Sequence, residues 1–81
     1  MEEERKYELK DRITTKLRVE KSMTFAEICE YVSSFNFSEW EVATTLPALC
    51  KEGYFRKVTQ KVKKRKFFNS TEVTETRYYL N

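Results

Sequence analysis

Residues 37–58 read FSEWEVATTLPALCKEGYFRKV, a capped helix followed by a glycine stop and the start of a basic strand. Ser38 and Glu41 have the spacing of a capping box, in which each side chain accepts a hydrogen bond from the backbone N–H of the other residue. Gly53 supplies the left-handed residue at which many helices end. Between them, apolar residues recur at helical spacing, at Val42, Leu46, Leu49 and Cys50. The stretch therefore predicts a helix between Ser38 and Gly53 with one apolar face, which must pack on the rest of the chain.

Two further helices are predicted before this stretch. The first covers about residues 3–19, where apolar side chains recur at every fourth position, at Leu9, Ile13 and Leu17. The second covers about residues 25–33 and begins at a second capping box, formed by Thr24 and Glu27. A short turn over residues 33–37 joins it to the third helix, so this pair is a helix-turn-helix candidate.

The pattern changes to alternation after the glycine. Valines alternate with lysines in the first segment, and residues 72–80 are rich in threonine and aromatic side chains, as strands are. Folding the chain about residues 67–68 gives a two-stranded hairpin with two opposed pairs, Val62 with Val73 and Lys57 with Tyr78. Residues 64–70 lack the Asn-Gly or Asp-Gly of a tight turn, so we expect a long, mobile tip there.

The basic charge is concentrated in the last third of the chain. The 81 residues carry a net charge of +3. Residues 1–53 hold eight lysines and arginines against eleven acids, whereas residues 54–81 hold eight against two. A concentrated basic segment suggests a polyanionic partner, and nucleic acid is the first candidate.

The composition argues against an enzyme, a metal site and a cofactor. The chain has no histidine, the side chain best suited to acid–base catalysis at neutral pH. Cys29 and Cys50 are too few for a zinc site without histidine, and we expect them to be buried thiols. No apolar run is long enough to span a bilayer and the start, MEEERK, is not a signal peptide, so we expect a cytoplasmic protein without a membrane partner.

Three helices followed by a two-stranded hairpin resemble the winged helix-turn-helix superfamily. The residues that carry the resemblance are 23–28 (MTFAEI) opening the second helix, then Leu46, Leu49, Gly53-Tyr54 and Arg56-Lys57, and 77–80 (RYYL) closing the hairpin. The match covers about residues 9–80, and we expect residues 1–81 to form a single domain of the α+β class. The resemblance implies that the third helix enters the major groove of DNA and that the two-stranded antiparallel β-hairpin, the wing, contacts the backbone or the minor groove. The same architecture also serves as a protein-binding module.

The outward face of the third helix is one candidate DNA-binding surface. It consists of Trp40, Thr44, Pro47, Ala48 and Lys51. Only Thr44 and Lys51 offer polar groups to base edges, whereas a reading helix typically offers Arg, Lys, Asn or Gln. Trp40 would lie along the DNA backbone. Pro47 removes a helical hydrogen bond and clashes with the carbonyl of residue 43, so we expect a kink or a break near Thr44.

The wing is the other candidate surface. Its basic residues are Lys57, Lys61, Lys63, Lys64, Arg65 and Lys66. Each can neutralise a phosphate, an interaction that is independent of base sequence and weakens with salt. The alternative is a solvated strand whose lysines prevent edge-to-edge aggregation. Four consecutive basic residues favour nucleic-acid binding over this alternative. Phe67 and Phe68 follow, and they fold back over the hairpin, pack on a partner or enter a minor groove.

These features predict a small transcriptional regulator that binds double-stranded DNA, with the wing supplying affinity and the third helix supplying fit. The first alternative is a protein-interaction module that docks through Trp40, Pro47 and the Phe67-Phe68 tip. The second is RNA binding by the basic hairpin. A homodimer would present two reading heads about 34 Å apart, and the sequence leaves the oligomeric state open. Such a regulator would act at the nucleoid or, if viral, in the host cytoplasm.

Overall fold

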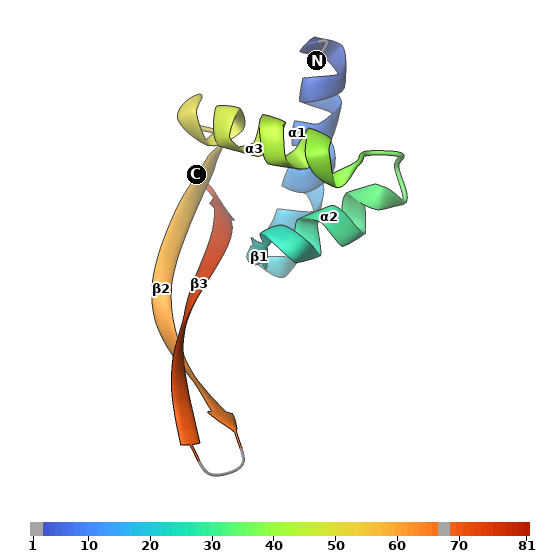
Figure 1. Cartoon of the computed structure of the whole chain (residues 1–81). Coiled ribbons are helices and arrows are strands. Elements are labelled where there is room, and N and C mark those ends of the chain that lie inside the picture. The colour runs from blue at the N-terminus through green and yellow to red at the C-terminus, as the bar shows by residue number, and fades with distance from the viewer. Residues whose placement is uncertain (1–2, 67–68) are drawn as a thin grey trace.

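Helices form the first two thirds of the chain and a sheet forms most of the last third. The computed structural model describes residues 3–66 and 69–81, and describes side chains for residues 3–63 and 73–81. The elements are α1 (Glu3–Glu20), β1 (Ser22–Thr24), α2 (Phe25–Ser33), α3 (Glu39–Lys51), β2 (Phe55–Lys66) and β3 (Asn69–Leu80) (Figure 1). The described part is therefore of the α+β class, with three helices and a three-stranded antiparallel sheet.

Both predicted capping boxes are present. The Thr24 hydroxyl accepts from the Glu27 backbone N–H at 3.2 Å, and Glu27 Oε1 accepts from the Thr24 N–H at 2.9 Å. The equivalent bonds between Ser38 and Glu41 measure 3.1 and 3.5 Å. The prediction of residues 25–33 for the second helix is confirmed, and α1 ends one residue later than predicted.

The third helix continues through Pro47, so the break predicted near Thr44 is wrong. Ala43 and Pro47 both lie on the exposed side. The carbonyl of residue 43, which lacks its usual amide partner, is therefore on the solvent side of the helix. The opposite side is fully buried, at Val42, Leu46 and Leu49, and this packing holds the helix together. A kink at the same place stays a prediction.

Gly53 ends α3 and turns the chain into β2. It has a φ of 93°, in the region that favours glycine. Its N–H donates to the carbonyl of Cys50 at 3.1 Å, and the N–H of Tyr54 donates to the carbonyl of Leu49 at 3.1 Å. These two bonds form a Schellman motif and confirm the predicted stop.

The central strand of the sheet is β3. It pairs with β2 along its length, and both predicted opposed pairs, Val62 with Val73 and Lys57 with Tyr78, are confirmed. Its other edge pairs with β1, where Met23 lies opposite Tyr78. The sheet therefore has three strands and not the two predicted. The three residues of β1 are too few to show the alternation that marks a strand in sequence.

The hairpin pairing extends closer to the tip than expected. The last pair is Lys66 with Asn69, so the prediction of a long loop over residues 64–70 is wrong. Residues 64–66 and 69–71 contain neither glycine nor proline, and nothing in their backbone interrupts the ladder. The predicted mobility concerns a tip whose residues, Phe67 and Phe68, lie outside the described part.

The hydrophobic core lies where the three helices meet the base of the sheet. Its buried apolar side chains are Leu9, Ile13, Leu17, Met23, Ile28, Val32, Phe37, Val42, Leu46, Leu49, Phe55 and Tyr78. The predicted stripe of α1 and the predicted apolar face of α3 both contribute to it. Among the side chains that the structure describes, those of the sheet join the core at its base alone.

Beyond β1 the hairpin continues as a two-stranded arm, which comprises residues 59–66 of β2 and 69–76 of β3. The arm projects from the helical body (Figure 1). The molecule consequently measures 49 Å along its longest axis, against 24 and 23 Å along the others. A projecting two-stranded ribbon buries little apolar surface and presents two faces to the surroundings.

Candidate nucleic-acid interface

The register of the hairpin defines its two faces. Residues opposite each other on antiparallel strands share a face, and successive residues alternate between faces. The face that carries buried Phe55 and Tyr78 is directed toward the helices. It continues outward as the lysine face, with Lys57, Thr59, Lys61, Lys63, Thr74 and Thr76. The opposite, valine face carries Arg56, Val58, Gln60, Val62, Val73, Glu75 and Arg77.

The four consecutive basic residues at positions 63–66 are divided between these faces. Lys63 and Arg65 occupy register positions of the lysine face, whereas Lys64 and Lys66 occupy positions of the valine face. The register thus places Lys57, Lys61, Lys63 and Arg65 on one face, and separates from them the other two predicted site residues of the wing, Lys64 and Lys66.

Three lysines of the lysine face are exposed. Across the ladder, Lys57 lies opposite Tyr78, Lys61 opposite Thr74 and Lys63 opposite Glu72. Among carboxylates whose side chains are described, none forms an ion pair with these lysines. Lys57 and Lys61, whose opposed residues are uncharged, therefore present free positive charge to a bound anion.

Threonine hydroxyls lie among these lysines. The Oγ1 atoms of Thr59 and Thr76 are 2.9 Å apart and share a hydrogen bond between the strands. On the valine face, the Arg56 guanidinium lies 5.4 Å from the centre of the Tyr79 ring, which orients it at the base of the arm. Both faces therefore carry groups that can bind phosphate.

The exposed stripe of α3 is nearly uncharged. Exposed positions are Trp40, Thr44, Pro47 and Lys51, as predicted, whereas Ala48 is half-buried. Trp40 is 71% exposed. The Thr44 Oγ1 lies 3.0 Å from the carbonyl oxygen of Trp40 and 3.1 Å from that of Glu41, so its proton is donated within the helix. Lys51 is the charged donor of this stripe.

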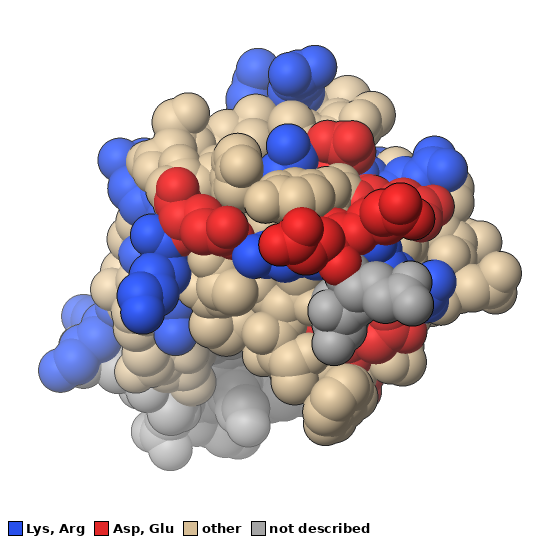
Figure 2. All heavy atoms as spheres, turned by 90° about the horizontal axis from the view of Figure 1, so that it is seen from above, with Lys and Arg blue, Asp and Glu red and all other residues tan. Residues whose placement is uncertain are grey.

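Acidic side chains gather around α3. The face that includes α3 and the start of α1 shows a band of acids, with lysines and arginines both between them and at the margins (Figure 2). Glu39 is exposed beside Trp40. Just beyond the helix, Glu52 lies 2.6 Å from Lys6 Nζ, and this hydrogen bond raises the pKa of Lys6. Because Glu52 is paired with Lys6, exposed Glu39 is the acid that makes the surroundings of the α3 stripe less favourable to phosphate than those of the arm.

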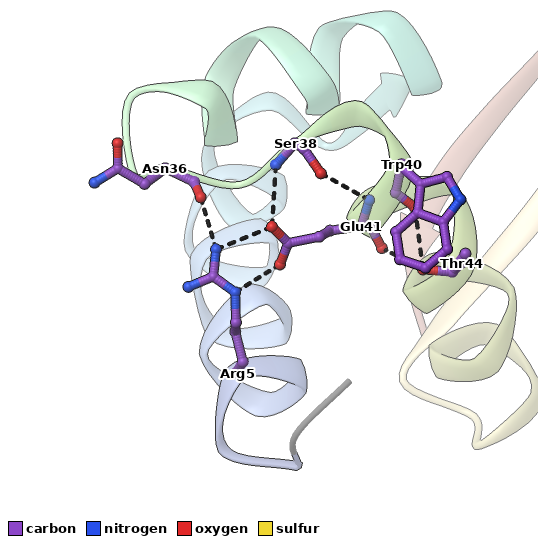
Figure 3. A network of polar contacts seen from close by, with 6 residues as sticks. All are labelled: Arg5, Asn36, Ser38, Trp40, Glu41 and Thr44. Carbon is purple, nitrogen blue, oxygen red and sulfur yellow. Dashed lines mark hydrogen bonds and ion pairs between the residues drawn. The ribbon is translucent and has the colours of Figure 1, made fainter.

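An ion pair between Arg5 and Glu41 connects the start of α3 to α1 (Figure 3). Arg5 Nε donates to Glu41 Oε2 at 2.6 Å, and its Nη2 donates to Glu41 Oε1 at 3.0 Å and to the carbonyl of Asn36 at 2.7 Å. The guanidinium also lies 4.6 Å from the centre of the Phe37 ring. Its hydrogen bonds are the main cause that lowers the pKa of Glu41. The sequence does not predict this contact, because no local pattern relates residues 36 positions apart.

The cysteines and acids of the described chain form no cluster of three that could hold a metal ion. Cys29 and Cys50 are half-buried free thiols, and burial raises the pKa of both. An open groove beside α2 is lined by Lys16, Glu20, Met23, Glu27, Glu30, Tyr31 and Ser34, and its three acids disfavour phosphate. Within the described ranges, no helix is long and apolar enough to cross a bilayer.

No protein-family model matches the chain, and comparisons with characterised proteins and with solved structures find no match either. Functional conclusions therefore rest on the geometry of the arm and of α3.

Proposed function

We propose that this chain is a DNA-binding protein, a small transcriptional regulator of the winged helix-turn-helix type that holds double-stranded DNA with its arm. The observation that carries the proposal is a row of exposed lysines on one face of the hairpin, with Lys61 and Lys63 on the projecting arm and Lys57 at its base. Such a row attracts phosphates regardless of base sequence, because each neutralised phosphate releases condensed counterions.

The order of the elements supports the winged helix-turn-helix type. Residues 34–38 join α2 to α3, and each of these helices begins at a capping box. The hairpin follows α3 through the Gly53 turn, at the place of the wing. The short strand β1 adds a third strand to the hairpin without changing this order.

In this proposal α3 supplies fit more than base-specific hydrogen bonds. The Thr44 hydroxyl donates to the backbone of its own helix, so it can only accept from a base. Lys51 offers one charged donor, and the Trp40 ring would lie along the sugar–phosphate backbone. Exposed Glu39 beside it opposes close approach of phosphate. The affinity is therefore expected to come chiefly from the arm.

Fluorescence anisotropy of a labelled random-sequence DNA duplex, titrated at several salt concentrations, tests the proposal. If Lys57, Lys61 and Lys63 each neutralise one phosphate, together they contribute about −2.7 to the slope of log K against log salt. A steep fall in affinity with salt supports the proposal, and absence of binding at low salt refutes it. Competition with a duplex RNA of the same sequence decides between DNA and the RNA alternative.

Protein docking through the α3 stripe is the second candidate, and the exposure of Trp40 favours it. Tryptophan anchors are common at the centres of protein interfaces, and here the first turn of α3 that carries it is fixed by the Arg5–Glu41 pair. Pro47 lies on the same stripe, while Phe67 and Phe68 lie outside the described part. This candidate replaces the first if the chain binds no duplex at low salt and Trp40→Ala abolishes binding to an isolated protein partner.

A further inference from the structure

We propose that the arm enters the major groove of B-form DNA, so that a phosphate backbone lies against each of its two faces. This inference rests on the proposed DNA-binding function and specifies the groove and the form of the duplex. It assigns to the arm the groove that the winged helix-turn-helix resemblance implies for the third helix.

Basic residues occupy register positions on both faces of the hairpin. Lys61 and Lys63 are exposed on the lysine face. Lys64 and Lys66 occupy register positions of the valine face, where Arg56 is exposed at the base of the arm. A ribbon lying flat on one DNA backbone would leave the cations of its outer face in water, where salt screens them. A phosphate backbone along each face would contact both sets of cations.

Glu75 is the acid on the valine face of the arm whose side chain is described, and it does not oppose this arrangement. Glu75 Oε1 lies 3.3 Å from Arg77 Nε, so its charge is already compensated within the sheet. Arg77 in turn donates to the Ser22 hydroxyl at 3.0 Å and is held at the base of the arm. The approach of a second phosphate backbone to this face therefore meets little repulsion from Glu75.

The dimensions of a two-stranded ribbon select the groove. Neighbouring strands lie about 5 Å apart, and side chains on both faces make the ribbon about 10 Å thick. The major groove of B-form DNA is about 12 Å wide and admits such a ribbon, whereas the minor groove is about 6 Å wide. The major groove of A-form RNA is deep and narrow, and side chains cannot read it.

The helical body leaves room for a duplex around the arm. The pairing of β1 with β3 is confined to residues 77–79, so within the described structure no strand covers the β3 edge over residues 69–76. At about 3.3 Å per residue, residues 59–66 extend for about 25 Å, and the outer part stands clear of the helices (Figure 1). A groove about 8.5 Å deep cannot take this length end-on, so the arm would lie along it.

Two matched double variants test whether both faces contact phosphate. Lys61→Ala with Lys63→Ala removes two charges from the lysine face, and Lys64→Ala with Lys66→Ala removes two from the valine face. On a random-sequence DNA duplex, we expect each pair to reduce the slope of log K against log salt by about 2. Arg18→Ala with Lys21→Ala, at exposed cations of the body, should leave the slope unchanged. Thermal unfolding checks that each variant is folded. If one arm variant keeps the wild-type slope while the other shows the reduced slope, the two-sided contact is overturned.

Groove-specific competitors identify the groove. We expect methyl green, which occupies the major groove, to displace the protein from the duplex, and netropsin, which occupies the minor groove, to leave it bound. A duplex RNA of the same sequence should compete at least about tenfold more weakly than the DNA. Displacement by netropsin alone, or equal competition by the RNA, would overturn the inference while leaving nucleic-acid binding in place. No binding to either duplex at low salt would instead remove the proposed function.

Discussion

Arg5 and Glu41, 36 positions apart in the sequence, form a two-pronged ion pair with N–O distances of 2.6 and 3.0 Å. The same carboxylate accepts from the Ser38 backbone N–H and so completes the capping box of α3. One side chain thus belongs both to the local signal that starts α3 and to the contact that joins α3 to α1.

Replacing Arg5 by alanine should lower the free energy of unfolding by about 1 kcal/mol, because the charged hydrogen bonds it donates are partly exposed and hence only moderately stabilising. Urea denaturation measures the change. Arg18→Ala, at an exposed position on the same helix, is the matched control and should stay within about 0.5 kcal/mol of wild type. Equal losses in the two variants would show that the Arg5–Glu41 pair adds nothing.

Stability should decrease as the pH falls below about 4.5, the ordinary pKa of glutamate. The pKa of Glu27 is lowered chiefly by the Thr24 backbone N–H, and that of Glu41 chiefly by Arg5. A carboxylate with a lowered pKa in the folded state stabilises the fold above its unfolded pKa, and this stabilisation is lost as the pH falls through the folded pKa. Urea midpoints measured from neutral to acidic pH should follow this course. The double variant Glu27→Gln with Glu41→Gln should give a flatter profile, and parallel profiles would contradict the assignment.

Pro47→Ala should raise the free energy of unfolding by about 1 to 3 kcal/mol. Proline in a helix interior is about 3 kcal/mol less favourable than alanine, and Pro47 is exposed, so little packing is lost in exchange. The substitution gives residue 47 a backbone N–H, which can donate to the carbonyl of residue 43. Thermal and urea unfolding measure the gain, with Thr44→Ala on the same stripe as control. A loss of stability in Pro47→Ala would show that the proline ring packs favourably where it lies.

Trp40→Ala should weaken DNA binding without changing its salt slope, since the indole carries no charge. Lys57→Ala, by contrast, should reduce the slope by about 0.9, the contribution of one phosphate. Anisotropy titrations of the two variants side by side separate these effects. A Trp40 variant with an altered slope would mean that its loss displaces the arm, and a Lys57 variant with the wild-type slope would place that lysine outside the interface.

Short-range signals predicted much of the fold. The capping boxes at Thr24 and Ser38 lie within four residues of the helices they start, so they operate whatever surrounds them. The hairpin register followed from opposed apolar pairs such as Val62 with Val73, because a slip of one residue would move every side chain to the other face. The division of the four basic residues 63–66 between two faces follows from the same register.

Other features depend on contacts between distant segments. The strand β1 exists because three residues after α1 meet the far end of the chain at residues 77–79. The Arg5–Glu41 pair likewise requires the start of α1 to reach the first turn of α3. The continuity of α3 through Pro47 comes from burial of its inner side, which outweighs the local preference against proline.

Thr24 is at once the last residue of β1, paired with Arg77 of β3, and the N-cap of α2. Thr24 therefore connects the sheet from which the arm extends to the start of α2, in addition to the covalent connection of α3 to β2 through Gly53. A rotation that includes residues 77–79 of β3 would strain both the β1–β3 pairing and the capping box of α2. Amide hydrogen exchange in the first turn of α2 would consequently slow when the base of the arm is held at a fixed angle, and would report on the arm from a helix outside the two proposed DNA-binding surfaces.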